Sequence, residues 1–262
     1  KFVAACEFYE QARYPGVRAL ESEAADFFLM LGDLPYADKF GAATTLEDYR
    51  AKHAAIHVTP DWISFLEKTP FFGVFDDHEI QNDWDAKTDP ALARAGLAAW
   101  GEWKPILVPS TGQYYRSFAW GADLRVFLLD TRTKRDSNLA PDRVGHSMLG
   151  VTQKAWLLRE LEAAKESFKL VVTSVPLRSG WKWRDHWEGY QRERSEIFAA
   201  LRSKGIEGVA FLSGDHHFSA RNHHAEGFPE LIVGALAAHH NKPPLERDPV
   251  MVESRTGPCY MR

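Results

Sequence analysis

The sequence predicts an α/β fold, in which short buried strands alternate with amphipathic helices. Short apolar runs recur along the chain, and apolar residues between several of them repeat at helical spacing. Four of the runs end in residues of metal-ligand type, and an α/β sheet presents its functional groups at the carboxyl ends of its strands. No repeat or linker interrupts the chain, so we expect one domain over residues 1–262.

Each expected strand is an apolar run bounded by polar residues or glycine. Residues 114–120 and 124–130 flank a turn at Gly121–Asp123, which is the pattern of a β-hairpin. The expected strands are residues 2–6, 27–31, 70–75, 114–120, 124–130, 170–177, 209–213 and 231–234.

Helices are expected where apolar residues recur every three or four positions. Thr45 precedes the longest of these segments and can cap it. In the same segment His53 and His57 lie four residues apart, a spacing that could bind zinc. No further ligand lies near them in the sequence, so we interpret both as part of a half-buried helix face. The expected helices are residues 16–26, 46–68, 90–104, a segment beginning near 152 and a segment that includes 197–201.

Composition limits the partners of this chain. A net charge of -4 over 262 residues indicates neither a nucleic acid nor a charged membrane surface as a partner, and it gives no oligomeric state. No apolar run approaches the ~20 residues that span a bilayer. The chain opens with a strand-like segment and no signal peptide, which also fits the mature end of an exported precursor. A disulfide could join Cys6 and Cys259, so cysteine usage leaves the compartment open.

The loop after residue 177 contains Trp181, Trp183 and Trp187. These side chains either pack a long loop onto the body of the protein or form a wall over its site. The sequence favours neither interpretation.

The densest polar stretch lies at residues 75–85, directly after an apolar run. It contains five acidic residues, His78 and Asn82 within eleven positions. Carboxylates this close together repel one another unless a cation or strong hydrogen-bond donors hold them. We therefore predict that this stretch forms part of a metal site.

Three other expected strands also end in residues that bind metals. Cys6 follows the first, Asp33 and Tyr36 follow the second, and Asp215 and His217 follow a late strand. Taken singly, Cys6 could be a buried core residue and Asp33 a turn residue or helix cap. Four such ends in one chain favour a polynuclear metal site, and Asp33 is a natural bridging carboxylate.

The ligand types point to two kinds of metal. A thiolate and a phenolate favour a transition metal, and tyrosine suits ferric iron. The carboxylates and the amide suit hard ions such as calcium or magnesium. Zinc would more usually bring several cysteines or histidines.

Such a site suits the hydrolysis of an anionic ester. Cations bind the phosphoryl oxygens and provide a hydroxide nucleophile at neutral pH. His78 is flanked by acidic residues that would keep it protonated, so we predict that it protonates the leaving oxygen.

The motifs together resemble the PhoD-like family of alkaline phosphatases and phosphodiesterases, within the calcineurin-like metallophosphoesterase superfamily. The matching segments, in order, are Ala5-Cys6, Gly32-Asp33 with Tyr36, Asp76 to Glu79 with Asn82-Asp83, Asp130 to Arg132, Leu149-Gly150 with Gln153 and Trp156-Leu157, Val175 to Leu177, and Ser213 to Asp215 with His217. As a set they are specific and cover most of the chain, whereas each alone is weak.

This resemblance implies a fold, cofactors and residue roles. The fold would be a sandwich of two β-sheets flanked by helices, the αββα arrangement, with Fe3+ and Ca2+ at one sheet edge. Cys6, Tyr36 and His217 would hold the iron and Asp33 would bridge. Asp215 and Asp77 would serve the hard ions, and His78 would be the proton donor.

The resemblance also implies a phosphate ester as substrate and a periplasmic or secreted location. Asn82 is the expected extra contact to metal or phosphate. His216 replaces an apolar residue common in the family, and we expect it to contact substrate. The chain lacks the N-terminal β domain of longer members, and its short tail leaves the choice between monoester and diester open.

Two alternatives remain. The site could hydrolyse another ester, such as a lactone or a lipid. The chain could also be a non-catalytic metal-binding domain on this fold, although the ligand set and His78 argue against that.

Overall fold

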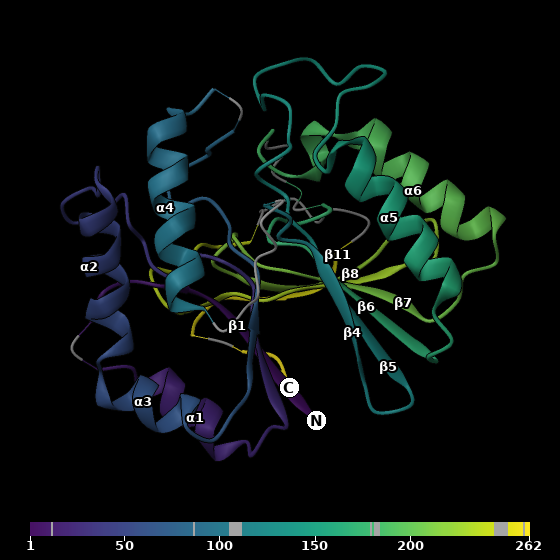
Figure 1. The fold of residues 1–262 in the computed structure, drawn as a ribbon. Helices are drawn as coiled ribbons and strands as arrows, with labels where there is room; N and C mark the ends of the chain where they lie inside the picture. The colour runs from purple at the N-terminus through teal and green to yellow at the C-terminus, as the bar shows by residue number, and fades with distance from the viewer. Residues whose placement is uncertain are drawn as a thin grey trace.

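The computed structural model describes residues 1–11, 13–85, 87–104, 112–178, 180, 184–243, 251–258 and 260–262. Two β-sheets pack face to face between two groups of helices (Figure 1). Helices α1 to α4 lie on one side of the sandwich, and α5 and α6 lie on the other. The predicted two-sheet α/β fold is therefore confirmed.

The smaller sheet is entirely parallel and has the strand order β10-β1-β2-β3. Its strands are β1 (Phe2–Phe8), β2 (Phe27–Met30), β3 (Phe71–Gly73) and β10 (Ala235–Ala237). In the register, Val3 lies beside Phe28 and Phe28 beside Phe71. Because the strands run in the same direction, the segments that follow β1, β2 and β3 meet at one edge.

The larger sheet has the order β11-β8-β9-β7-β6-β5-β4. Its strands are β4 (Arg116–Trp120), β5 (Leu124–Leu128), β6 (Phe168–Val172), β7 (Val209–Ser213), β8 (Ser219–His223), β9 (Pro229–Ile232) and β11 (Met251–Arg255). The central strands β5, β6, β7 and β9 pair in parallel, and β4, β8 and β11 pair antiparallel to their neighbours. The hairpin of β4 and β5 was predicted, whereas β8, β10 and β11 were not.

The helices are α1 (Pro15–Ser22), α2 (Leu46–His57), α3 (Pro60–Leu66), α4 (Pro90–Trp103), α5 (Gly150–Ala163) and α6 (Gln191–Ser203), with a short 3-10 helix, η1 (Trp187–Gly189). The prediction of one helix over residues 46–68 is wrong. Proline lacks an N–H and disfavours the helical conformation in the residue before it, so the chain turns extended at Thr59 and restarts at Pro60. Thr45 caps α2 as expected, in a capping box with Asp48.

Strand residues alternate between two apolar layers. Ala4 and Cys6 face the space between the sheets, where they pack with Val126, Leu128 and other large-sheet residues. Val3 and Ala5 face the opposite way, into a cluster formed with α1, α2 and α3. A third cluster buries the other face of the large sheet beneath α5 and α6. This packing on both faces fixes the sheet edge that carries the polar residues.

The structure shows the surroundings of Trp187 and of the pair His53 and His57. Trp187 is buried in the core beneath α5 and α6, and its Nε1 donates to Thr173 Oγ1 at 2.9 Å, so this residue packs its loop onto the body. Trp181 and Trp183 lie outside the described residues. His53 is buried and His57 is half-buried, and both lie beside Trp103. Neither belongs to a metal-ligand cluster of the described residues. Within the described ranges, no helix has the length and apolarity of a membrane span.

Candidate metal centre

Polar side chains from the ends of four strands meet at one edge of the sandwich. Glu7 lies near the end of β1, Asp33 follows β2, Asp76 and Asp77 follow β3, and Asp215 follows β7. Three of these residues, Glu7, Asp33 and Asp215, have left-handed φ angles of 63°, 62° and 71°. Non-glycine residues rarely adopt this conformation, and it occurs preferentially at functional sites. These backbone conformations set the direction in which the three carboxylate side chains point.

Gly32 allows two of these segments to approach. Its φ is +115°, and a Cβ built on it would lie 2.5 Å from the Cβ of Asp76. Any other residue would therefore push the loop after β2 away from the loop after β3. Gly32 therefore sets the spacing of Asp33 and Asp76.

Several carboxylate oxygens at this edge have no hydrogen-bond partner among the described residues. Oxygens of Asp33, Asp76, Asp77 and Asp215 lie within 4.8 Å of one another. One oxygen each of Glu7, Asp33, Asp76 and Asp77 is buried without a hydrogen-bond partner among the described residues. Burial raises the pKa of Asp33 and of Asp215 well above the usual range, and the neighbouring carboxylates raise both further. Such oxygens fit multivalent cations, which would satisfy them and cancel their repulsion.

Asp76 and Asp77 differ from the others because cationic side chains face them. Arg132 Nε donates to Asp76 Oδ1 at 2.7 Å, and Ser174 Oγ donates to the same oxygen at 2.5 Å. Burial raises the pKa of Asp77, but His78 and Arg132 oppose this and leave it lowered. Asp77 is therefore ionised at neutral pH.

Tyr36 and His217 form a second group of possible ligands. Tyr36 Oη lies 2.9 Å from His217 Nε2, and His217 Nδ1 lies 2.6 Å from the carbonyl oxygen of His239. The carbonyl can only accept, so Nδ1 carries the proton and Nε2 presents its lone pair. Burial lowers the pKa of His217 to about 4, so the imidazole is neutral at pH 7. A neutral imidazole is the form that binds a metal.

Glu7 joins this second group, which sequence reasoning missed. Its carboxylate has a ligand atom within 4.8 Å of those of Asp33 and His217, and its side chain is fully buried. Burial raises its pKa well above the usual range, and the charge of Asp215 adds to the effect. The available signal was its position at the end of β1, next to Cys6.

Cys6 is the predicted ligand that the structure does not bring into these groups. Its Sγ lies 3.1 Å from the carbonyl oxygen of Val233 and 3.5 Å from that of Gly234, in the core between the sheets. No described cluster of metal-binding atoms includes it. A role for Cys6 as an iron ligand stays a prediction.

His78 lies beside both groups of ligands. Its ring stacks on Tyr36 with centroids 4.0 Å apart, and its Nδ1 lies 2.7 Å from Asp38 Oδ1. The other oxygen of Asp38 accepts from the backbone N–H of Asn82 at 2.9 Å. Burial lowers the pKa of His78, but the charges of Asp77 and Asp38 outweigh this and raise it to about 9. His78 is therefore protonated at neutral pH, as its acidic neighbours in the sequence suggested.

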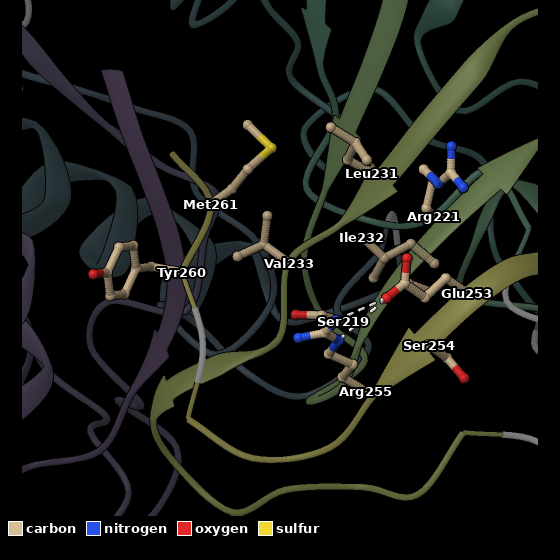
Figure 2. Close-up of a pocket in the computed structure, with 11 residues that line it drawn as sticks. Ser219, Arg221, Leu231, Ile232, Val233, Glu253, Ser254, Arg255, Tyr260 and Met261 are labelled. Atoms are coloured by element: carbon tan, nitrogen blue, oxygen red, sulfur yellow. Dashed lines mark hydrogen bonds and ion pairs between the residues drawn. The ribbon is translucent and has the colours of Figure 1, made fainter. Parts of the chain in front are cut away.

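A cavity of about 150 Å³ opens onto these side chains. Asn82 and His216, the two predicted substrate contacts, both line it. The other lining residues are Asp77, His78, Asp83, His186, Asp215, His217, His239 and Asn241. A second pocket, formed by β8, β9, β11 and residues 260–261, shares none of these residues (Figure 2). Its charged pair, Arg255 and Glu253, belongs to no metal-ligand cluster of the described residues.

Comparison with known proteins agrees with this geometry. The family model described as PhoD-like phosphatase matches residues 2–256. The chain belongs to this family. The resemblance of the motifs to this family is thereby confirmed.

Three relatives show how far the similarity extends. Alkaline phosphatase D of Bacillus subtilis (strain 168) is 26% identical over 85% of this chain. The solved structure of PhoD matches 89% of the chain with a TM-score of 0.79 and 21% identity. The purple acid phosphatase PPD1 from yellow lupin seeds matches 98% with a TM-score of 0.62 and 13% identity. The chain spans only 46%, 56% and 48% of these three proteins, respectively.

Proposed function

We propose that this PhoD-like chain is a metal-dependent phosphoesterase. One observation carries the proposal. The carboxylates of Asp33, Asp76, Asp77 and Asp215 have oxygens within 4.8 Å of one another, and two of these residues, Asp77 and Asp215, line the same cavity as a neutral His217 and a protonated His78. The carboxylates suit cations, and the protonated imidazole suits an acid catalyst. When bound, the metal ions would supply charge stabilisation for the phosphoryl oxygens and a nucleophile at neutral pH.

The proposed ligands divide by chemistry. Tyr36 and His217, with Cys6 and Glu7, would hold Fe3+, because phenolate and imidazole suit a transition metal. Asp77 and Asp215 would hold Ca2+, which prefers carboxylate oxygens. Asp33 would bridge the two positions, since it lies close to both Glu7 and Asp77.

The proposed catalytic acid is His78. Its Nδ1–H donates to Asp38, so Nε2–H is the proton that it can transfer to the oxygen of the leaving alcohol. Asn82 and His216 would contact the phosphate ester from the cavity wall. A periplasmic or secreted location, as the family resemblance implies, completes the proposal.

Metal analysis and activity profiling test this proposal. Elemental analysis of the purified protein should find iron together with calcium, and the Tyr36 phenolate should give a visible charge-transfer band. The metal-loaded protein should hydrolyse 4-nitrophenyl phosphate or bis(4-nitrophenyl) phosphate, with 4-nitrophenyl acetate as the carboxylic-ester control. No turnover of either phosphate ester with metals loaded would overturn the proposal, and turnover of the acetate alone would favour another esterase.

A further inference from the structure

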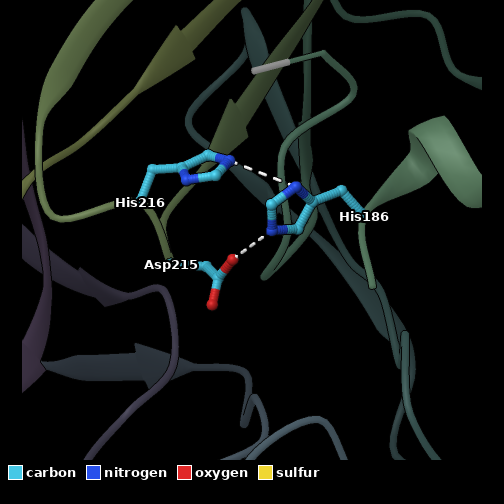
Figure 3. Close-up of side chains that lie close together, drawn as sticks. All are labelled: His186, Asp215 and His216. Atoms are coloured by element: carbon cyan, nitrogen blue, oxygen red, sulfur yellow. Dashed lines mark hydrogen bonds and ion pairs between the residues drawn. The ribbon is translucent and has the colours of Figure 1, made fainter. Parts of the chain in front are cut away.

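His186 reaches the metal centre from a loop that gave no sequence signal for a ligand. It lies between β6 and η1, and its Nε2 is 2.6 Å from Asp215 Oδ2 (Figure 3). The side chain is buried and lines the same cavity as Asp77 and His78.

The neighbouring residue anchors this part of the loop. Asp185 accepts from Arg132 Nη1 at 2.9 Å and Nη2 at 2.7 Å, and from Arg135 Nη1 at 2.8 Å. All three side chains are buried, and two-point contacts between arginine and carboxylate fix orientation as well as distance. Arg132 also binds Asp76, so one guanidinium ties the His186 loop to the segment after β3.

Hydrogen-bond partners assign the tautomer of His186. A carboxylate that binds a cation is ionised and can only accept, so in the metal-bound protein Nε2 of His186 would carry a proton. On the other side of the ring, His186 Nδ1 lies 3.1 Å from His216 Nε2. In neutral His186 this Nδ1 is an acceptor, so His216 Nε2 is the donor. Figure 3 shows the two contacts, from His216 to His186 and from His186 to Asp215.

We propose that His186 is a positioning residue that holds Asp215 in the orientation in which it binds a divalent cation. The inference rests on the proposed metal dependence. The bond to Oδ2 leaves Oδ1 of Asp215 for the cation, and Asp215 already lies within 4.8 Å of Asp33, Asp76 and Asp77. A separation of 2.6 Å between His186 Nε2 and Asp215 Oδ2 is that of a hydrogen bond to a charged group.

The test compares variants that keep or remove the donor. In His186→Gln the amide N–H can still reach Asp215, whereas His186→Leu has no donor and His186→Asn is too short to reach. Each chelator-stripped protein is titrated with Ca2+ and separately with Mn2+ by calorimetry. In the Leu and Asn variants we expect the metal affinity of one site to fall roughly 10- to 100-fold, the usual effect of losing a residue that supports a ligand. Gln should restore most of the affinity, and the number of sites should not change.

His224 supplies the matched control. It forms a buried pair with Glu230 at 3.0 Å and does not line the metal cavity. His224→Leu and His224→Gln should leave Ca2+ and Mn2+ affinity unchanged. Circular dichroism establishes that each variant is folded. If His186→Leu does not fold, His186→Asn takes its place in the comparison.

Several outcomes would overturn the inference. Wild-type metal affinity in both the Leu and the Asn variant would show that the donor is irrelevant. If all three variants instead bound one metal ion fewer than the wild type, His186 would be a ligand. The inference would also fail if the wild-type protein had no ion site that the Asp215→Asn substitution removes. If instead the ion binds and depends on His186 but no phosphate ester is hydrolysed, only the proposed function falls.

Discussion

Nδ1 of His78 lies 2.7 Å from a carboxylate oxygen of Asp38, and the second oxygen of that carboxylate holds the backbone N–H of Asn82. The side chain of Asp38 thus holds both the ring of His78 and the loop that follows His78. Asp38 lies just beyond the loop that carries Asp33 and Tyr36, so the arrangement links two of the strand ends that form the metal centre.

Removing the imidazole of His78 should separate metal binding from turnover. His78→Ala is expected to lower kcat for phosphate esters by roughly 10²-fold or more, the usual contribution of a general acid. Metal content by elemental analysis should stay at the wild-type level, because His78 is not among the proposed ligands. Unchanged turnover would remove His78 from the mechanism.

Replacing Asp38 should move the pH dependence of turnover. The negative charge of Asp38 favours protonated His78, so Asp38→Asn should lower the pKa of His78 from its raised value of about 9. Because the acid must be protonated to act, activity is lost as pH rises through this pKa, and the alkaline limb should shift to lower pH. A pH profile of kcat measures the shift, and an alkaline limb at the same pH in both proteins would contradict it.

The metal-free protein should become more stable when a buried carboxylate is neutralised. Burial raises the pKa of Asp33, so the folded protein binds its proton more tightly than the unfolded chain, and stability falls as pH rises above about 4. Asp33→Asn should therefore stabilise the chelated protein by roughly 1–3 kcal/mol at pH 8 and by little at pH 4.

The same variant should lose the stabilisation that added metal gives the wild type. Thermal melts with chelator and with Ca2+, at both pH values, measure these differences. A chelated Asp33→Asn protein less stable than the wild type at pH 8 would show that the carboxylate repulsion is compensated within the chain.

Gly32→Ala should destabilise the fold at the metal edge. The added Cβ would lie 2.5 Å from that of Asp76 and would force a φ of +115° on alanine, so we expect a loss of about 2 kcal/mol or more. Gly121→Ala is the control, because its φ of +67° is also unfavourable but nothing lies within 4 Å of the new Cβ. It should cost roughly 1–2 kcal/mol. Chemical denaturation of both variants gives the comparison, and equal losses would remove the steric argument.

The location of the metal edge follows from the sequence because parallel strands end on the same side of a sheet. Asp33 and Asp77 follow β2 and β3, which are neighbouring parallel strands of the smaller sheet. Asp215 follows β7 of the larger sheet and joins them because the two sheets pack face to face. Its acidic neighbours predicted that His78 is protonated, and the charge of one of them, Asp77, is among those that raise its pKa. These predictions depend on local pattern and strand direction, which the sequence determines.

Only the tertiary structure decided which other side chains complete the centre. Glu7, with its φ of 63°, lies close to Asp33 and His217, which its place in the sequence beside Cys6 did not predict. That backbone angle depends on the contacts around β1 and leaves no sequence signature. His186 meets Asp215 across 29 positions because a buried pairing of Asp185 with Arg132 and Arg135 anchors its loop. Periodicity cannot reveal such a contact, because it arises from charge pairing between loops rather than from strand order.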